Sequence, residues 1–215
     1  MRRVSYMCFQ RIFRAFIPLL VAALWLSVPV VARSQILTVT ATNLVDASQF
    51  TGDETDPSIA ISPLNPSNMV IAAAIDSQPA GLLISTTTNM GANWTTNLIA
   101  TNGDSQGLVA AYGEPSVTWD IYGNLFVAYL PDTLEGVAVA ISTNEGATFG
   151  MLTNLAAQDS TDQPKITSPP LGAAVGSAWV MYKDYSIGGT PLIVQGVLSS
   201  GLGTNGVFTP VEMVP

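Results

Sequence analysis

The chain has 215 residues, with seven basic and 15 acidic side chains, a formal net charge of −8 and no histidine. Its single cysteine, Cys8, and all five of its arginines lie within the first 33 positions, so the rest of the chain has two lysines against 15 acidic residues, a net charge of −13. This composition excludes the basic surface that nucleic acid requires. It also excludes thiol and imidazole catalysis and zinc sites built from His or Cys after residue 33.

The first 34 residues have the layout of a secretory signal peptide. Four arginines precede an apolar run, Ala15–Val31, and the small-x-small sequence Ala32-Arg33-Ser34 follows it. This order is typical of a cleaved signal peptide. An uncleaved anchor is the alternative, although 17 residues with two prolines are short for a membrane span. We expect export to a secreted or cell-surface location and no membrane association after cleavage. Residues 35–51 are expected to form a leader strand or a linker.

After residue 50 the chain repeats a segment of about fifty residues. The sequences "DPSIAISPLNPSNMVIAAAID" (Asp56–Asp76) and "EPSVTWDIYGNLFVAYLPD" (Glu114–Asp132) align, and "QPKITSPPLGAAVGSAWVMYKD" (Gln163–Asp184) is a weaker third copy. Each copy begins with an acidic or amide residue followed by proline, and each ends in an apolar run and an aspartate. Roughly three copies of one structural repeat are therefore predicted.

Each copy is predicted to contain four short β-strands and no helix. In the second copy, strands are expected over Ser116–Ile121, Leu125–Leu130, Val137–Ser142 and Phe149–Leu155, with turn residues between them. Apolar residues at period two in the first strands are expected to face inward. These residues are Ile59, Ile61, Val117 and Trp119.

Four antiparallel strands repeated at this period are typical of a β-propeller blade. We expect an all-β fold with blades over about 52–107, 108–158 and 159–215, which would form the N-terminal part of a six- or seven-bladed ring. Closed propellers need roughly 4 to 8 blades. An open arc, or several chains assembled into one ring, are the alternatives.

Two shorter segments share a pattern, and this pattern carries a family resemblance. "TTTNMGANW" begins at Thr86 and "STNEGATF" at Ser142, and aligned on their glycines they read Ser/Thr-x-Asn-x-Gly-Ala-x-aromatic. The pattern resembles the Asp-box, or bacterial neuraminidase repeat, of sialidase-like β-propellers, and the resemblance extends over Asp56 to about Asp184. The chain departs from the family at the position that names the box, where Asn89 and Asn144 replace Asp.

The resemblance implies that the box is a structural corner between the third and fourth strands, far from the ligand face. Asn accepts hydrogen bonds from nearby backbone N–H groups and tolerates left-handed backbone angles, and glycine adopts a positive φ without steric cost. A catalytic role would need an acid, a base or a nucleophile, and Asn is none of these. The residues assigned to this structural role are Thr87, Asn89, Gly91, Trp94, Ser142, Asn144, Gly146, Thr148 and Phe149.

Ligands of propellers bind at the loops that enter the first strand and leave the second strand of each blade. The repeats place eight carboxylates there: Asp53, Glu54, Asp56, Asp76, Glu114, Asp132, Asp162 and Asp184. The candidate ligand-binding residues are Asp56, Asp76, Glu114, Asp132 and Asp184, and Asp76 and Asp132 are favoured because each directly follows an inner strand. Such carboxylates could bind calcium or act as an acid and nucleophile pair; capping of turns is the alternative. Three aromatic residues, Trp119, Tyr129 and Tyr182, could stack on sugar rings, but core packing is the favoured role.

The sequence thus predicts recognition of a carbohydrate or cell-surface ligand, without evident catalysis in this chain. Sialidases of the family hold the substrate carboxylate with three arginines, and lysine does not replace a bidentate guanidinium without loss. No arginine follows Arg33. One alternative is the N-terminal part of an exo-sialidase-like glycoside hydrolase whose catalytic residues lie beyond Pro215. The other is a calcium-binding structural or adhesive surface module. Calcium is the one cofactor that the sequence suggests.

Overall fold

The computed structural model describes residues 44–77, 79–169, 176–185, 192–199 and 209–212. Every described residue belongs to one compact part, Leu44–Pro215. The expected signal peptide and residues 35–43 of the expected leader lie outside the described residues. Within the described ranges, no helix has the length and apolar character needed to cross a membrane.

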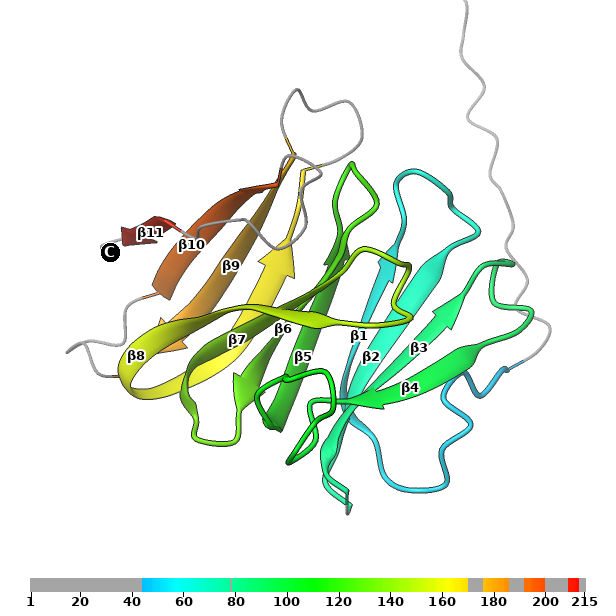
Figure 1. Ribbon diagram of the computed structural model, residues 1–215, viewed down its shortest axis with the longest axis horizontal. Helices are drawn as coiled ribbons and strands as arrows, with labels where there is room; N and C mark the ends of the chain where they lie inside the picture. The colour runs from blue at the N-terminus through cyan, green and yellow to red at the C-terminus, as the bar shows by residue number, and fades with distance from the viewer. Residues whose placement is uncertain (1–43, 78, 170–175, 186–191, 200–208, 213–215) are drawn as a thin grey trace, which may run out of the picture. The chain divides into compact units, whose positions relative to one another are not determined.

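The described part of the chain consists of strands and connecting segments, which confirms the predicted all-β class. The strands are β1 (Thr55–Ile61), β2 (Met69–Ile75), β3 (Gly81–Thr87), β4 (Thr95–Ile99), β5 (Ala111–Trp119), β6 (Leu125–Pro131), β7 (Glu135–Ser142), β8 (Gly150–Thr167), β9 (Gly176–Asp184), β10 (Leu192–Ser199) and β11 (Thr209–Glu212). They form a four-stranded sheet, β1 to β4, and a seven-stranded sheet, β5 to β11 (Figure 1). In both sheets each strand pairs antiparallel with its neighbour in sequence.

Strand β8 belongs to two four-stranded groups within the larger sheet. Its first part, Gly150–Leu155, pairs with β7, and its last part, from Thr161 onward, pairs with β9. We therefore define repeat 1 as β1–β4, repeat 2 as β5–β7 with the first part of β8, and repeat 3 as the last part of β8 with β9–β11. The boundary expected near residue 158 falls inside this continuous strand.

Apolar side chains pack the repeats together in two cores. The first core joins repeats 1 and 2 and includes Ile84 from β3 and Val127 from β6; the second joins repeats 2 and 3 and includes Phe126 and Val180. Alternate residues of β6 enter different cores, so both faces of repeat 2 are covered. This is why β6 is an unbroken apolar run rather than an alternating one.

The inward orientation predicted for Ile59 and Ile61 is wrong. These side chains are 62% and 56% exposed, whereas Val117 and Trp119, at the equivalent positions of repeat 2, are each 5% exposed. The period-two alternation of apolar residues is present in both strands, but the face of repeat 1 that carries Ile59 and Ile61 is covered differently from the equivalent face of repeat 2. Repeat 1 covers the face of repeat 2 that carries Val117, while no sheet of the described chain covers the matching face of repeat 1.

Candidate functional site: a rim of first-strand bulges

The first strand of each repeat begins with a β-bulge at the residue that precedes proline. Asp56, Glu114 and Gln163 occupy this position, and each has a φ of 52°. The pairing with the second strand shifts register around each of them. A positive φ is uncommon for residues with a side chain. Its recurrence at one position of the repeat indicates a single backbone arrangement that the chain builds three times.

A hydrogen bond connects the bulges of repeats 2 and 3. Glu114 Oε2 accepts a hydrogen bond from the backbone N–H of Gln163 at 2.7 Å. Partial burial raises the pKa of the Glu114 carboxyl, the Gln163 N–H opposes this, and the nearby charges of Asp162 and Asp56 raise the pKa further. Asp56 of repeat 1 and Asp162 of repeat 3 therefore lie close enough to Glu114 of repeat 2 to affect the pKa of its carboxyl.

Asp162 connects this line of carboxylates to the end of β9. Lys183 Nζ lies 3.7 Å from Asp162 Oδ2, and the hydroxyl of Tyr185 donates a hydrogen bond to the same oxygen at 3.0 Å. Tyr185 is anchored through its backbone N–H, which donates to Ser160 O at 3.1 Å. The site thus brings together a carboxylate, an ammonium and a phenol group, joined by one ion pair and one hydrogen bond at Asp162.

Serine side chains fix the first strands of neighbouring repeats to each other just beyond the bulges. Ser58 Oγ accepts a hydrogen bond from Val117 N at 3.2 Å, and Ser116 Oγ accepts one from Ile166 N at 3.0 Å. Lys165 occupies the equivalent position of repeat 3. The spacing between the first two bulges, and between the second and third, is therefore set by a direct hydrogen bond between strands.

Four of the five predicted ligand-binding residues lie at one end of the sheets. Asp56 and Glu114 are the bulge residues of β1 and β5, while Asp76 and Asp132 directly follow β2 and β6. The last two are exposed, and Asp132 is held by a backbone hydrogen bond from its N–H to Ala110 O. We call this end the rim; it comprises Asp56, Asp76, Tyr112, Glu114, Asp132, Asp162 and Tyr185.

The fifth predicted residue, Asp184, does not occupy the equivalent position. In each repeat, one residue of the second strand pairs with the residue that precedes the bulge of the first strand. These paired residues are Ala74, Leu130 and Lys183, so they occupy equivalent positions. Tyr185, rather than Asp184, therefore matches Asp76 and Asp132. Asp184 lies one position deeper and is 6% exposed. The sequence alignment matched the aspartates by type, and a shift of one residue moves a side chain to the other face of a strand.

The aromatic residues at the rim differ from those considered in the sequence. Trp119, Tyr129 and Tyr182 are buried in the two cores, as the favoured assignment predicted. Burial raises the pKa of the Tyr182 hydroxyl to about 12. Tyr112 and Tyr185, which no pattern in the sequence singles out, are 58% and 43% exposed at the rim. Only their positions in the repeat could have indicated them. Tyr112 lies two residues before the bulge at Glu114, and Tyr185 directly follows the second strand of repeat 3.

The two Asn-Gly boxes make the same turn at the opposite end of the sheets. In the first box Thr87 Oγ accepts from Gly91 N at 3.1 Å, and Asn89 Oδ1 accepts from Asn93 N at 2.9 Å. The corresponding distances in the second box are 2.9 Å, from Gly146 N to Ser142 Oγ, and 3.0 Å, from Thr148 N to Asn144 Oδ1. The boxes connect β3 to β4 and β7 to β8, and both glycines have a positive φ.

The second box also packs against repeat 1. Asn97 Nδ2 donates to Gly146 O at 3.2 Å, and Asn68 Nδ2 donates to Glu145 Oε1 at 2.9 Å. Phe149 is buried in the first core, whereas Trp94 of the first box is half-buried. The boxes therefore contribute hydrogen bonds and packing, and none of their side chains lies at the rim.

In the described parts of the chain, no three side chains of His, Cys, Asp or Glu are grouped so that they could hold a metal ion. Neither a model of a known protein family nor a curated protein matches the chain. The rim is therefore defined by its own geometry, as three bulges with linked carboxylates and two exposed tyrosines.

Proposed function

We propose that the chain forms blades of a sialidase-like Asp-box β-propeller whose rim recognises carbohydrate, on an exported protein. Three observations support the blade assignment: the four-stranded antiparallel repeats, the apolar cores between successive repeats, and the box turn between the third and fourth strands. A fold of this kind hosts many functions, so the function depends on the side chains of the rim.

The observation that carries the proposal is the combination of carboxylates and exposed tyrosines at one end of the sheets. Sugar hydroxyls are hydrogen-bond donors, and the carboxylates of Asp76, Asp132 and Asp162 are acceptors. Tyr112 and Tyr185 offer apolar ring faces with a polar tip, which suits the mixed surface of a sugar ring. A rim with both kinds of group matches the chemistry of a neutral or amino sugar.

The backbone of the rim supports binding because it is fixed before any ligand arrives. The Gln163 N–H to Glu114 bond and the two serine bonds between first strands hold the bulges in position. A site that is already ordered loses less conformational entropy on binding. The proposed role is recognition rather than sialidase chemistry, because the chain after Arg33 has no arginine to hold a sialic acid carboxylate.

The test is a glycan array screen with the exported chain, followed by calorimetric titration of the best ligand. We expect Tyr112→Ala and Tyr185→Ala each to weaken binding by about tenfold, which corresponds to ~1.4 kcal/mol. Tyr122→Ala is the matched control, because Tyr122 is an exposed tyrosine in the turn between β5 and β6, at the other end of the strands. Absence of glycan binding, or an equal loss in the control, would contradict the proposal.

A further inference from the structure

Two sheet faces of the described chain carry exposed apolar side chains and lie at opposite ends of the series of repeats. The first is the face of repeat 1 that carries Ile59 and Ile61, which we call face A. The second is the face of repeat 3 that carries Trp179 and Met181, which are 41% and 39% exposed and which we call face B. Ala178, Val180 and Tyr182 alternate with these two residues and fill the second core, so face B points away from repeat 2.

Each open face corresponds to a face that is buried elsewhere in the same chain. Face A is the counterpart of the side of repeat 2 that packs on repeat 1, since Ile59 and Ile61 match Val117 and Trp119 in strand register. Face B is the counterpart of the side of repeat 2 that packs on repeat 3. A contact of face B with face A would therefore continue the packing that already joins repeat 1 to repeat 2 and repeat 2 to repeat 3.

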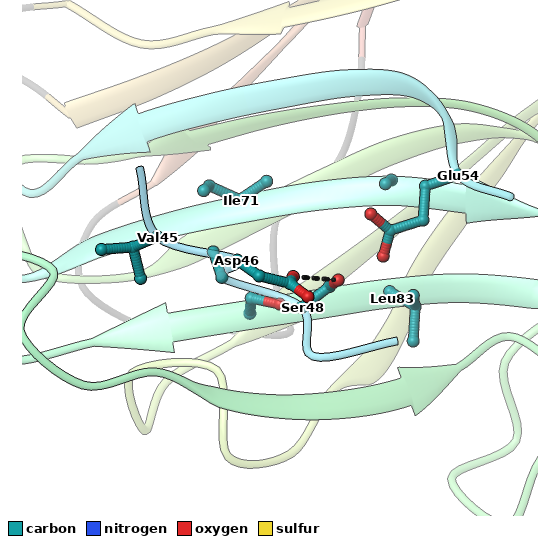
Figure 2. A pocket seen from close by; sticks show the side chains of 9 residues that line it. Val45, Asp46, Ser48, Glu54, Ile71 and Leu83 are labelled. Atoms are coloured by element: carbon teal, nitrogen blue, oxygen red, sulfur yellow. Dashed lines mark hydrogen bonds between the residues drawn. The ribbon is translucent and has the colours of Figure 1, made fainter. Parts of the chain in front are cut away.

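Face A contains a cavity of about 250 Å³ at a position where the other repeats have an aromatic ring. Ala73 lines it, and the residues in the same strand register are Tyr129 in repeat 2 and Tyr182 in repeat 3. Figure 2 shows the cavity between the segment from Val45 to Ser48 and the side chains of Ile71 and Leu83. The first sheet thus lacks a ring of its own here, and a large apolar side chain from outside could occupy the space.

The charges of the two faces are complementary. Lys165 and Lys183 are the two lysines of the chain, and they share a side of repeat 3 with Met181 and Trp179. Because Lys183 forms an ion pair with Asp162, Lys165 supplies the positive charge of face B. Asp46 and Glu54 line the cavity on face A (Figure 2). Contact between two B faces would bring lysines together and contact between two A faces would bring carboxylates together, whereas B on A pairs opposite charges. The charges therefore favour a head-to-tail arrangement.

We propose that a second copy of this chain covers both faces, with face B of each copy on face A of the other. Such contacts close when the rotation between subunits permits it. Two copies supply six four-stranded repeats, which is within the roughly 4 to 8 blades of closed propellers. The pairing of the faces is independent of carbohydrate recognition, while closure with two copies rests on the blade assignment proposed above.

Sedimentation velocity of the exported chain between 1 and 100 μM tests the pairing. The expected result is one species with twice the mass of a single copy. Ile61→Asp and Trp179→Asp, which change one face each, should both give a single-copy species. An equimolar mixture of the two variants retains one intact A–B contact and should form a pair at concentrations where neither variant does so alone.

Three controls separate the outcomes. Tyr122→Asp changes an exposed aromatic residue away from both faces and should leave the pair intact. Thermal unfolding of each variant should match the unchanged chain at single-copy concentration, because the altered side chains are exposed. Glycan binding by the single-copy variants should persist, since the rim is unaltered, so failure of pairing and failure of carbohydrate recognition are separate results.

A single-copy species at every concentration would overturn the proposal, and the two faces would then belong to a different partner, such as further polypeptide. Self-pairing of either face variant would overturn the head-to-tail arrangement. Growth into polymers would overturn closure with two copies.

Discussion

Repeats 1 and 2 present equivalent faces to different surroundings. In repeat 2 the face that carries Trp119 and Tyr129 is buried against repeat 1. In repeat 1 the equivalent face leaves Ile61 exposed, while Ala73 is buried beside the segment around Ala47, whose carbonyl accepts a hydrogen bond from Thr96. The strand pattern is the same in both. The comparison teaches that alternation along a strand fixes which face a side chain takes, while burial depends on the neighbouring sheet.

The largest expected difference concerns the pair Trp119 and Ile61. Trp119→Ala should lower the free energy of unfolding by about 3–5 kcal/mol, because it opens a cavity in the first core. Trp119 Nε1 has no hydrogen-bond partner within the described residues, so the loss reflects packing alone. Ile61→Ala, on the open face, should cost less than about 1 kcal/mol. Urea unfolding at low micromolar concentration measures both, and equal losses would show that face A is covered in the isolated copy.

The next largest difference concerns the residue that follows each first strand. Asp120 is fully buried and accepts hydrogen bonds from Tyr122 N, Asn124 N and Asn124 Nδ2 at 2.7–2.8 Å. Ser62, at the matching position of repeat 1, accepts one from Asn65 N at 3.4 Å. Asp120→Ala should therefore cost about 3 kcal/mol and Ser62→Ala about 0.5–1 kcal/mol.

The same urea titrations measure this pair. A smaller loss in the aspartate variant than in the serine variant would indicate that water replaces the lost carboxylate in the turn after β5.

The two box glycines give a smaller contrast. Both have a positive φ, so alanine at either should cost about 1–2 kcal/mol from the backbone alone. A Cβ at Gly146 would lie 2.7 Å from Thr86 Cγ2, whereas a Cβ at Gly91 would lie 3.4 Å from the flexible end of Met69. Gly146→Ala should be the more damaging by a further ~1 kcal/mol or more. Thermal unfolding of the two variants side by side checks the order, and the reverse order would show that the second box does not pack on repeat 1.

The smallest effect concerns the charge at the rim. The pKa of Glu114 is higher in the folded chain than in the unfolded chain, so this carboxyl ionises at a lower pH when the chain is unfolded. Ionisation of Glu114 therefore lowers the free energy of unfolding. Glu114→Gln retains an acceptor for the Gln163 N–H and should slightly raise the melting temperature at pH 7. The difference should shrink as the pH falls below 4.5, the ordinary pKa of Glu. A difference that grows on acidification would contradict the sign.

Local sequence patterns predicted much of the fold. Period-two alternation and the turn sequence around Tyr122 placed β5, β6 and β7 within a few residues, because these signals depend on neighbours in the chain. The continuous β8 was not predicted. Its middle, Ala156–Asp159, has the small and polar residues of a loop, yet the strand runs through it because β7 pairs with its first part and β9 with its last.

The site was predicted in part, for a related reason. The repeated acidic-Pro sequence correctly brought Asp56 and Glu114 to one end of the sheets, since both start a first strand. The place of Asp184 depends on strand register, which a single sequence does not specify. Exposure of Tyr112 and Tyr185 depends on what lies over them, so composition gave no means of separating them from the buried Tyr129 and Tyr182.

Because β8 is continuous, the connection between repeats 2 and 3 (the second joint) differs in structure from the connection between repeats 1 and 2 (the first joint). Repeats 1 and 2 are joined by residues 100–110, a connection with exposed glycines at 103 and 107 and short turns at Asp104. Repeats 2 and 3 share one strand, whose two parts are bonded to different neighbours. The first joint belongs to no strand, whereas the second lies within β8, so proteolysis is expected at the first joint rather than the second. Cleavage at the first joint should divide the chain into repeat 1 and a covalently fused pair of repeats, which the first core and the hydrogen bond from Val117 N to Ser58 Oγ would still hold together.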